Sequence, residues 1–375
     1  MAEDRDFDVV IAGGGPVGCT LSLALAGSGV SVARIGGDRS AADRPIALSH
    51  GSRLILERLG AWKQFQTTPI ETIHVSQRHG FGRTVMRSVE HDLPALGYVT
   101  AYSEILAALV AQTPAITAML KDWKADDEGV DLRLTRDGED VRMRARLLVL
   151  ADGGATLGND RVSDYDQHAV TAEVATARAH RGIAWERFTV EGPLALLPFR
   201  DRYAVIWSVR PATAAGLLGL ADAEFLARLR ETFGGRLGEF VSVGPRAGFP
   251  LALRRYKPEP AARTLAVGNA AQTLHPVAGQ GLNLGLRDAW ELAQMLLETP
   301  REEIGTSRFV ARYARRRRLD RYAGIGVTDF LVRAFSGSFA PLAAARGAGL
   351  AMLDILPPAR RFLARRMIFG ARALP

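Results

Sequence analysis

Three glycines near the start of the chain have the types and spacing to bind a phosphorylated ligand. Gly13, Gly15 and Gly18 form a G-x-G-x-x-G pattern that follows an apolar run. In such a loop the first glycine permits a tight turn, the second lets the backbone approach a pyrophosphate, and the third lets a helix pack closely on a strand. Free amides and the dipole at the helix start would then hold the phosphates. The spacing predicts a dinucleotide-binding site.

The elements that must position this loop form one βαβ unit. Phe7 to Ala12 is an apolar run typical of a buried parallel strand. Small and apolar residues predict a helix over Cys19 to Ala26, and Val30 to Ile35 predicts a second strand. The glycine loop would therefore join the first strand to the helix, which is the context that a dinucleotide loop requires.

Two later strands end in polar or glycine residues. Ala145 to Leu150 is followed by Asp152 and Gly153, and Thr264 to Val267 is followed by Gly268 and Asn269. Open α/β sheets bind ligands at the carboxyl ends of their strands, so these residues join the candidate site.

The end of the second predicted strand departs from the dinucleotide pattern. Gly36 stands where an acid usually binds the adenosine ribose, and Asp38 is the candidate to reach the ribose hydroxyls from a looser loop. Arg34 would instead favour a phosphate, as in a NADP site, or would simply face solvent. The sequence alone leaves these alternatives open.

Segments of different character lie between the predicted parallel strands. Thr72 to Met86 and Ala169 to Pro211 are rich in β-branched and aromatic residues, which predicts antiparallel strands in a second domain inserted into the first. After Asp288 the chain is predicted to be mainly helical.

Composition and missing motifs exclude several other classes of protein. The 375 residues are 47% hydrophobic and 23% charged, as in a soluble globular protein, and the single cysteine, Cys19, rules out a disulfide framework or a cysteine-rich metal site. The acidic start does not resemble a signal peptide, and the most apolar late stretch, Phe339 to Leu356, is interrupted by Arg346 and Asp354. The chain has no P-loop, no Gly-x-Ser-x-Gly elbow and no histidine spacing typical of zinc, so no metal site is predicted.

The net charge of +8 is concentrated at the end of the chain. Phe330 to Pro375 holds seven arginines and one acid, Asp354, so the rest is nearly neutral. This distribution argues against nucleic-acid binding, because the charge does not lie on a ligand-reading domain. A basic, apolar segment suits an anionic membrane surface or an acidic partner, with a solvated helix face as the alternative.

The segment from Leu265 to Asp288, LAVGNAAQTLHPVAGQGLNLGLRD, resembles the second flavin motif of the aromatic-ring hydroxylases. Its sequence is similar to that of the ubiquinone-biosynthesis hydroxylases, especially the 2-polyprenyl-6-methoxyphenol hydroxylase group. The likeness extends over nearly the whole chain and includes Asp43 to Ser49, Tyr165 to Val170, Glu186 to Thr189, Gly192 to Pro198 and Ile325 to Asp329.

The resemblance implies a role for each motif. Gly268 and Asn269 would contact the ribityl–phosphate region of FAD, although many relatives outside the ubiquinone group have aspartate at position 269. The helix beginning at Gly279 would turn its amides toward the flavin pyrimidine ring. His275 would lie beside the ring, as the one catalytic candidate or, more simply, as a packed structural residue. The implied cofactor-binding residues are Gly13, Gly15, Gly18, Asp38, Arg44, Asp152, Gly153, Gly268, Asn269, Pro276, Gly279, Gly281, Leu282 and Asn283.

The expected fold class is α/β, with a Rossmann-like FAD-binding domain, an inserted substrate domain of mixed or antiparallel sheet, and a helical C-terminus. The expected FAD-binding domain covers residues 1–71, 97–164 and 255–329, the substrate domain 72–96 and 165–254, and the basic helical segment 330–375.

The family's activity is single-component monooxygenation, in which NADH or NADPH reduces FAD transiently and dioxygen then hydroxylates a phenol ring. The resemblance implies a polyprenylated phenol as substrate, a ubiquinone-synthesis complex as further partner, and a cytoplasmic enzyme peripheral to the inner membrane. Two rivals remain: a non-catalytic member of such a complex, suggested by Gly36 and by the unusual Leu157-Gly158-Asn159 after the Asp152 turn, and a FAD dehydrogenase that does not activate oxygen.

Overall fold

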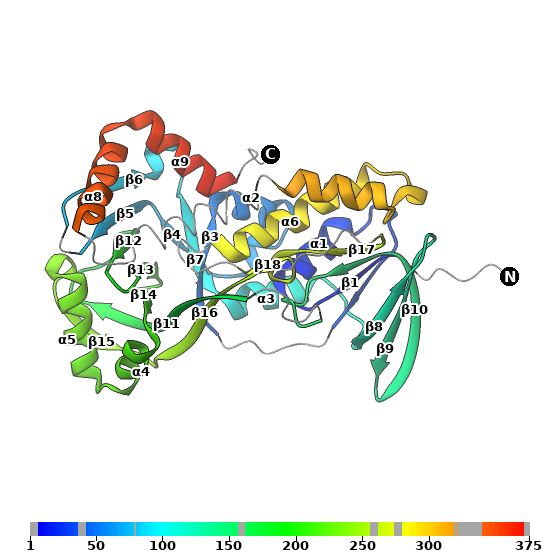
Figure 1. Ribbon diagram of the computed structural model, residues 1–375, viewed down its shortest axis with the longest axis horizontal. Helices are drawn as coiled ribbons and strands as arrows, with labels where there is room; N and C mark the ends of the chain where they lie inside the picture. The colour runs from blue at the N-terminus through cyan, green and yellow to red at the C-terminus, as the bar shows by residue number, and fades with distance from the viewer. Residues whose placement is uncertain are drawn as a thin grey trace.

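Figure 1 shows a sheet with covering helices at each end of the molecule. The computed structural model describes residues 7–36, 43–78, 80–156, 162–255, 262–273, 280–318, 320 and 340–370. Within these ranges the strands form sheets of six, nine and three strands.

The six-stranded sheet has a parallel core. Its parallel part has the order β2-β1-β10-β17, with β10 placed between β1 and β17. The first half of β10 pairs instead with β9, and β9 with β8, so that an antiparallel meander extends from the sheet. The bounds are β1 (Phe7–Ala12), β2 (Val32–Ile35), β8 (Met119–Ala125), β9 (Val130–Arg136), β10 (Glu139–Leu150) and β17 (Thr264–Ala266).

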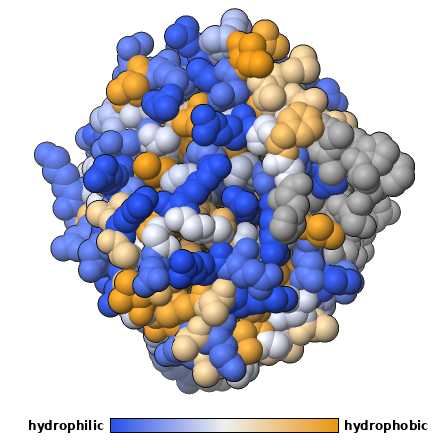
Figure 2. Space-filling model, turned by 90° about the vertical axis from the view of Figure 1, so that its left-hand side faces the viewer, coloured by the Kyte–Doolittle hydropathy of each residue, from blue (hydrophilic) through white to orange (hydrophobic). Residues whose placement is uncertain are grey.

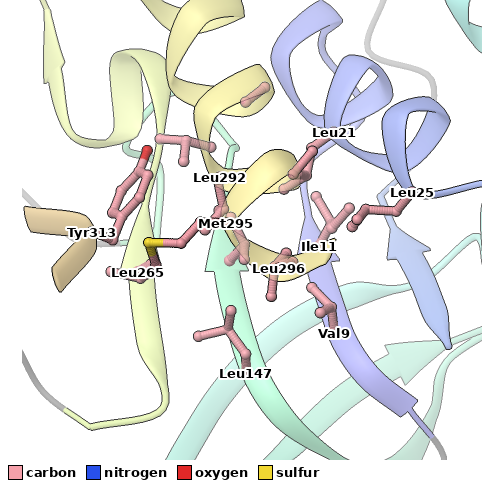
Figure 3. Packing of buried hydrophobic residues seen from close by; sticks show 14 of the residues in the cluster. Val9, Ile11, Leu21, Leu25, Leu147, Leu265, Leu292, Met295, Leu296 and Tyr313 are labelled. Carbon is pink, nitrogen blue, oxygen red and sulfur yellow. The ribbon is translucent and has the colours of Figure 1, made fainter. Parts of the chain in front are cut away.

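Alternate residues of the parallel strands supply two cores. Val9 and Ile11 face α1 (Pro16–Leu25) and α6 (Gln280–Leu297), and Figure 3 shows Leu292, Met295 and Leu296 of α6 packed over this face. Val10 and its neighbours turn to the opposite face, where the meander covers them. Both faces of the strands are therefore buried, which explains their nearly continuous apolar sequence.

The nine-stranded sheet has the order β18-β16-β11-β14-β13-β12-β5-β6, with β15 paired to β11. Helices α4 (Pro211–Gly219) and α5 (Asp222–Phe233) cover one of its faces. The bounds are β5 (Thr72–Gln77), β6 (Arg83–Arg87), β11 (Val162–Thr176), β12 (Ile183–Phe188), β13 (Pro193–Phe199), β14 (Arg202–Val209), β15 (Phe240–Val243), β16 (Ala247–Arg255) and β18 (Gln272–Thr273).

The small third sheet joins the two larger ones. Its strands are β3 (Pro45–Ser49), β4 (Thr68–Ile70) and β7 (Gly97–Ala101), accompanied by α2 (His50–Arg58) and α3 (Tyr102–Val110). The short helices are η1 (Trp62–Gln64), η2 (Ser88–His91), η3 (Gly235–Leu237), η4 (Gly268–Ala270) and η6 (Arg301–Glu303), and a longer helix covers 307–318.

Two helices at the end of the chain fold back over the nine-stranded sheet. In Figure 1 α8 (Ala340–Ile355) and α9 (Pro357–Phe369) lie above β5 and β6. Leu350 of α8 packs on Phe188, and Ile368 of α9 packs on Met86. None of the helices in the described ranges is both long and apolar enough to cross a bilayer.

The predicted α/β fold class is confirmed, and the predicted first strand coincides with β1. The second strand begins two residues later than predicted, at Val32, and the helix begins earlier, because Pro16 occupies its first position. Strands β8 and β9 were not predicted from the sequence.

Candidate active site

The three glycines of the first loop have different surroundings. At Gly13 φ is +146°, and a side chain there would collide with the carbonyl of Ala151. At Gly18 a Cβ atom would lie 2.6 Å from the carbonyl oxygen of Gly13, so this glycine permits close packing of α1. At Gly15 the nearest atom to a Cβ would be the Tyr102 hydroxyl oxygen at 3.8 Å, and a longer side chain there would enter an open cavity.

This cavity is continuous and has a volume of about 2160 Å³. One end is lined by residues that the sequence analysis assigned to the cofactor: Gly13, Gly15, Arg44, Asp152, Gly153, Asn269, Gly281 and Leu282. The other end is lined by the free face of the nine-stranded sheet and by α8 and α9. Most small-molecule pockets measure roughly 300–1,000 Å³, so this cavity has room for a dinucleotide and a second ligand.

The structure explains why glycine occupies position 36. Its φ is +146°, and a Cβ atom there would approach the Gly14 amide nitrogen to 3.1 Å. An acid at this position would press against the phosphate loop. Both interpretations of Arg34, as a phosphate ligand and as a solvent-facing side chain, are wrong. The residue is only 3% exposed, and its guanidinium donates to the Thr113 carbonyl at 2.6 Å. It ties β2 to the end of α3 and is neither a phosphate ligand nor a solvated side chain.

Arg44 and Asp152 line the cavity together with the glycine loop. The Arg44 guanidinium lies 5.0 Å from the centre of the Tyr102 ring, and burial raises the pKa of the Tyr102 hydroxyl, which therefore stays protonated. The Asp152 carboxylate accepts hydrogen bonds from the amides of Gly154 at 2.9 Å and Thr156 at 2.7 Å. Its side chain thus stabilises its own turn, in which Gly153 adopts a φ of +76°.

The second flavin motif brings η4 and the start of α6 to the same cavity. Gly268 has a φ of +60° and donates its amide to the Asp288 carboxylate at 3.1 Å. Asn269 and Gly281 line the cavity together. The buried Asn283 side chain points elsewhere: its oxygen accepts from the Ser49 amide at 2.8 Å, and its amide donates to the Ala47 carbonyl at 2.9 Å. It holds α6 against β3.

A buried ion-pair network supports this motif from behind. Asp288 is fully buried and accepts from Arg317 at 2.7 Å, and Arg317 also donates to Asp320 at 2.8 Å. Burial disfavours the charged guanidinium, but the neighbouring Asp288 outweighs this cost and raises the pKa of Arg317. In the sequence Asp288 is only the last residue of the flavin motif, and its ion pair with Arg317 was not predicted.

The far wall of the cavity is apolar apart from a few side chains. Residues from six strands contribute Ile73, Val75, Met86, Ala184, Phe188, Ala195, Leu197, Ile206 and Phe249. Glu186 of β12 lies among them, and burial raises its pKa to about 7. Glu186 belongs to one of the segments that resemble the family, but no function was predicted for it from the sequence.

Four predicted site residues lie outside the described residues: Asp38, His275, Pro276 and Gly279. Among the predicted site residues that the structure describes, those of the glycine loop decide whether FAD fits the site. Helix α1 begins at Pro16, and no side chain among the described residues caps its first amides. Those amides lie beside Gly15, whose missing side chain leaves the cavity open for a pyrophosphate. The residues present therefore fit FAD.

A family model described as an FAD binding domain matches residues 6–322. Since the match covers most of the chain and agrees with the glycine loop, the protein is a flavoprotein that binds FAD.

The relatives identify the family more closely. A ubiquinone hydroxylase, UbiL, of Rhodospirillum rubrum is 34% identical over 97% of this chain and 90% of its own length. The 3-demethoxyubiquinol 3-hydroxylase of Escherichia coli is 29% identical over 92% of this chain and 94% of its own length. The chain belongs to the FAD-dependent hydroxylase family of ubiquinone biosynthesis, whose members are aromatic-ring monooxygenases.

A solved structure supports the fold. The p-nitrophenol 4-monooxygenase PnpA of Pseudomonas putida superposes with a TM-score of 0.74 at 18% identity and covers 98% of this chain and 99% of its own. The chain therefore shares its overall fold with that monooxygenase.

Proposed function

We propose that this enzyme hydroxylates the ring of a polyprenylated phenol in ubiquinone biosynthesis, with NADH or NADPH as transient electron donor. The observation that carries the proposal is the single cavity, which is bounded by the glycine loop at one end and by an apolar wall at the other. A cofactor held at the loop and a hydrophobic substrate held at the wall would share one cavity, as transfer of an oxygen atom between them requires.

The proposed roles of the protein and of FAD follow from the positions of the lining residues. The amides at the start of α1 would hold the pyrophosphate, and those at the start of α6 would face the flavin ring. Bound FAD supplies the redox chemistry, with electrons from NAD(P)H and oxygen from O2. The chain's own part is to position the two ligands and to exclude water with the apolar wall.

The substrate's tail requires a long apolar path. The cavity beyond the sheet is lined by Leu350 and Leu353 of α8, by Leu356 between the two helices, and by Leu363 and Met367 of α9. Each isoprenoid carbon buried against such residues contributes roughly 0.8 kcal/mol, so a tail along the two helices would bind tightly. Residues 1–71, 97–164 and 255–329 would then form the FAD-binding domain, 72–96 and 165–254 the substrate domain, and 330–375 the tail-binding segment.

The same two helices are the proposed contact with an anionic membrane. Ile355 is 76% exposed and Phe362 is 65% exposed, and Arg361 and Arg365 are exposed near them. Figure 2 faces this end of the molecule, and near its top hydrophobic side chains adjoin hydrophilic ones. Arg360, by contrast, is occupied by the Asp354 carbonyl at 2.9 Å and by Glu90 at 3.3 Å, so the charge available to a membrane is smaller than the sequence predicts.

Two experiments test the proposal. Removal of the enzyme from its cell should cause an under-hydroxylated prenyl phenol to accumulate, identified by mass spectrometry. Purified enzyme supplied with NADPH, ¹⁸O₂ and a short-chain prenyl phenol should incorporate one labelled oxygen into the ring. NADPH oxidation without a labelled product would indicate a dehydrogenase, and protein that does not retain FAD would indicate a non-catalytic member of a complex.

A further inference from the structure

Glu186 lies in the middle of an apolar wall. Side chains alternate along β12, so Ala184, Glu186 and Phe188 share one face, whereas Trp185, which also lines the cavity, packs on the core cluster of α5. On the neighbouring strands Glu186 pairs with Val75 of β5 and Ala195 of β13. Its neighbours in the sheet are therefore apolar on both sides.

The carboxyl group of Glu186 makes no hydrogen bond or ion pair within the part of the chain that the structure describes. Its Oε1 atom is shielded from solvent and has no hydrogen-bond partner there. Burial raises the pKa of this carboxyl to about 7, and no cation is among the causes of the shift. A polar group left unpaired against an apolar wall costs free energy, which is typical of a group that a ligand will pair.

The wall on either side of Glu186 leads toward two different parts of the cavity. Ala184, one step before it on this face, belongs to a cluster with Val99 of β7, and Val99 pairs with Ala47, which lines the cofactor end. Phe188, one step after it, packs on Leu350 of α8. Glu186 thus stands between the cofactor end and the apolar helices.

We propose that Glu186 is a catalytic residue that accepts the hydroxyl proton of the phenol, while the tail of the phenol lies along α8 and α9; the inference rests on the proposed function. An amphipathic phenol has one polar group at its ring and an apolar remainder. The carboxylate is the polar anchor that this wall offers, and the helices supply the apolar path.

The proton balance is simple. The phenol O–H bond breaks and its proton passes to a carboxylate oxygen of Glu186, while the electron pair stays on the phenol oxygen and enriches the ring. A ring carbon then accepts the oxygen atom that the established reaction supplies. That carbon then loses its hydrogen as a proton to water, which makes the ring aromatic again, and the phenol oxygen recovers a proton from Glu186. The carboxylate is regenerated, and no further oxidant is needed.

The ionised form of Glu186 is the active one, so hydroxylation should fall as the pH decreases through about 7. The residues that pair with Glu186 on the neighbouring strands, Val75 and Ala195, carry no charge. The charged residues that line the cavity farther along are Asp43, Arg44, Lys121, Asp137, Asp152, Glu173, Arg246 and Arg346. Glu239, whose side chain is 74% exposed and is not among the residues that line the cavity, is the control for the loss of a carboxylate.

The test compares E186Q with E239Q as FAD-loaded enzymes. E186Q keeps the size of the side chain and cannot take a proton. We expect it to retain FAD and to oxidise NADPH, with hydroxylation at pH 8 slowed about 10²- to 10⁴-fold and with its fall below pH 7 abolished. E239Q should keep the rate and the pH profile of the wild type, and E186D should keep the pH dependence at a reduced rate.

A second measurement needs no variant. At pH 8 the wild-type enzyme should bind a short-chain prenyl phenol about tenfold more tightly than its methyl ether, because only the phenol donates a hydrogen bond to the carboxylate. Equal affinities, or an E186Q enzyme with wild-type hydroxylation and pH profile, would overturn the role of Glu186 and leave the proposed function intact. A wild-type enzyme that hydroxylates no prenyl phenol would overturn both.

Discussion

At the scale of single residues, the glycine loop shows how similar positions carry different constraints. Gly13 is confined by the Ala151 carbonyl and Gly18 by the backbone of Gly13, whereas Gly15 faces an open cavity. Gly15 also has a φ of −78° and a ψ of 172°, which any residue adopts. Its lack of a side chain therefore serves the ligand and not the fold.

This difference gives the first prediction. Gly15→Val should fold normally and purify without flavin, because its side chain would fill the space of the pyrophosphate. Visible absorbance measures bound FAD, and circular dichroism measures folding. Gly216→Val is the matched control, since a Cβ at Gly216 of α4 meets nothing within 4 Å. A Gly15→Val protein with its full complement of FAD would show that the loop is not the binding site.

The start of α6 gives a second prediction at this scale. Gly281 lines the cavity, and a Cβ there would lie 3.9 Å from the Asn269 side-chain oxygen, so aspartate fits the helix. Its charge would oppose the negative charge of the reduced flavin in a site of low dielectric. We expect Gly281→Asp to have a lower flavin reduction potential and slower reduction by NADPH, measured by redox titration and stopped flow. Gly281→Ala should remain near wild type, and an unchanged potential in Gly281→Asp would place the flavin ring elsewhere.

Site residues were predictable where a motif names them and not where the fold creates them. The glycine loop and Asn269 reach one cavity as their motifs indicate. Glu186 was not predictable as a functional residue, because only the finished sheet shows that its face is apolar. Gly36 looked like a missing acid until its positive φ and its approach to Gly14 were known.

At the scale of elements, α6 is the support of the cofactor end. It packs on the parallel strands through Leu292 and Leu296, and Asp288 joins it to Gly268 and to the helix at 307–318. The network is buried, so removing the Asp288 charge leaves Arg317 with less compensating negative charge in a medium of low dielectric, although Asp320 still accepts from it.

Asp288→Asn should therefore destabilise the protein by about 3 kcal/mol and loosen the Gly268 turn. Urea unfolding measures the loss, and FAD retention reports on the turn. Asp222→Asn is the control: the Asp222 carboxylate pairs with Arg246 at 3.0 Å but is 69% exposed, so its loss should cost at most about 1 kcal/mol. Equal losses in the two variants would show that the buried network adds nothing to stability.

Elements with strong patterns were predicted well, and weakly amphipathic ones were missed. β1 is apolar throughout because both its faces are buried, which makes it conspicuous in the sequence. β8 exposes much of its surface and carries charged residues, so its pattern is faint. The Asp137–Gly138 turn between β9 and β10, where both residues have positive φ, was the available hairpin signal.

At the scale of the whole molecule, the cavity requires both large sheets and the returning C-terminal helices. The cofactor end is built by segments from the first half and from the flavin motif, and the apolar end is closed by α8 and α9 (Figure 1). A substrate tail that lies along these helices would leave the protein close to Ile355 and Phe362, the exposed apolar residues. The path into the site and the proposed membrane contact are thus on the same helices.

This arrangement gives the last prediction. Replacing Arg361 and Arg365 together by glutamine should weaken binding to vesicles of phosphatidylglycerol and phosphatidylcholine by about 30-fold at low salt, since each basic residue contributes roughly 1 kcal/mol near such a surface. The double variant Arg308→Gln with Arg315→Gln removes two exposed arginines from the helix at 307–318 and should bind as the wild type does. Vesicle sedimentation measures both. Added salt should remove the difference, because it screens the charges. Phe362→Ser should weaken binding at all salt concentrations, because its contribution is hydrophobic. If neither the arginine pair nor Phe362 changes sedimentation, these helices do not touch the membrane, and the tail must enter from an aqueous carrier or a protein partner.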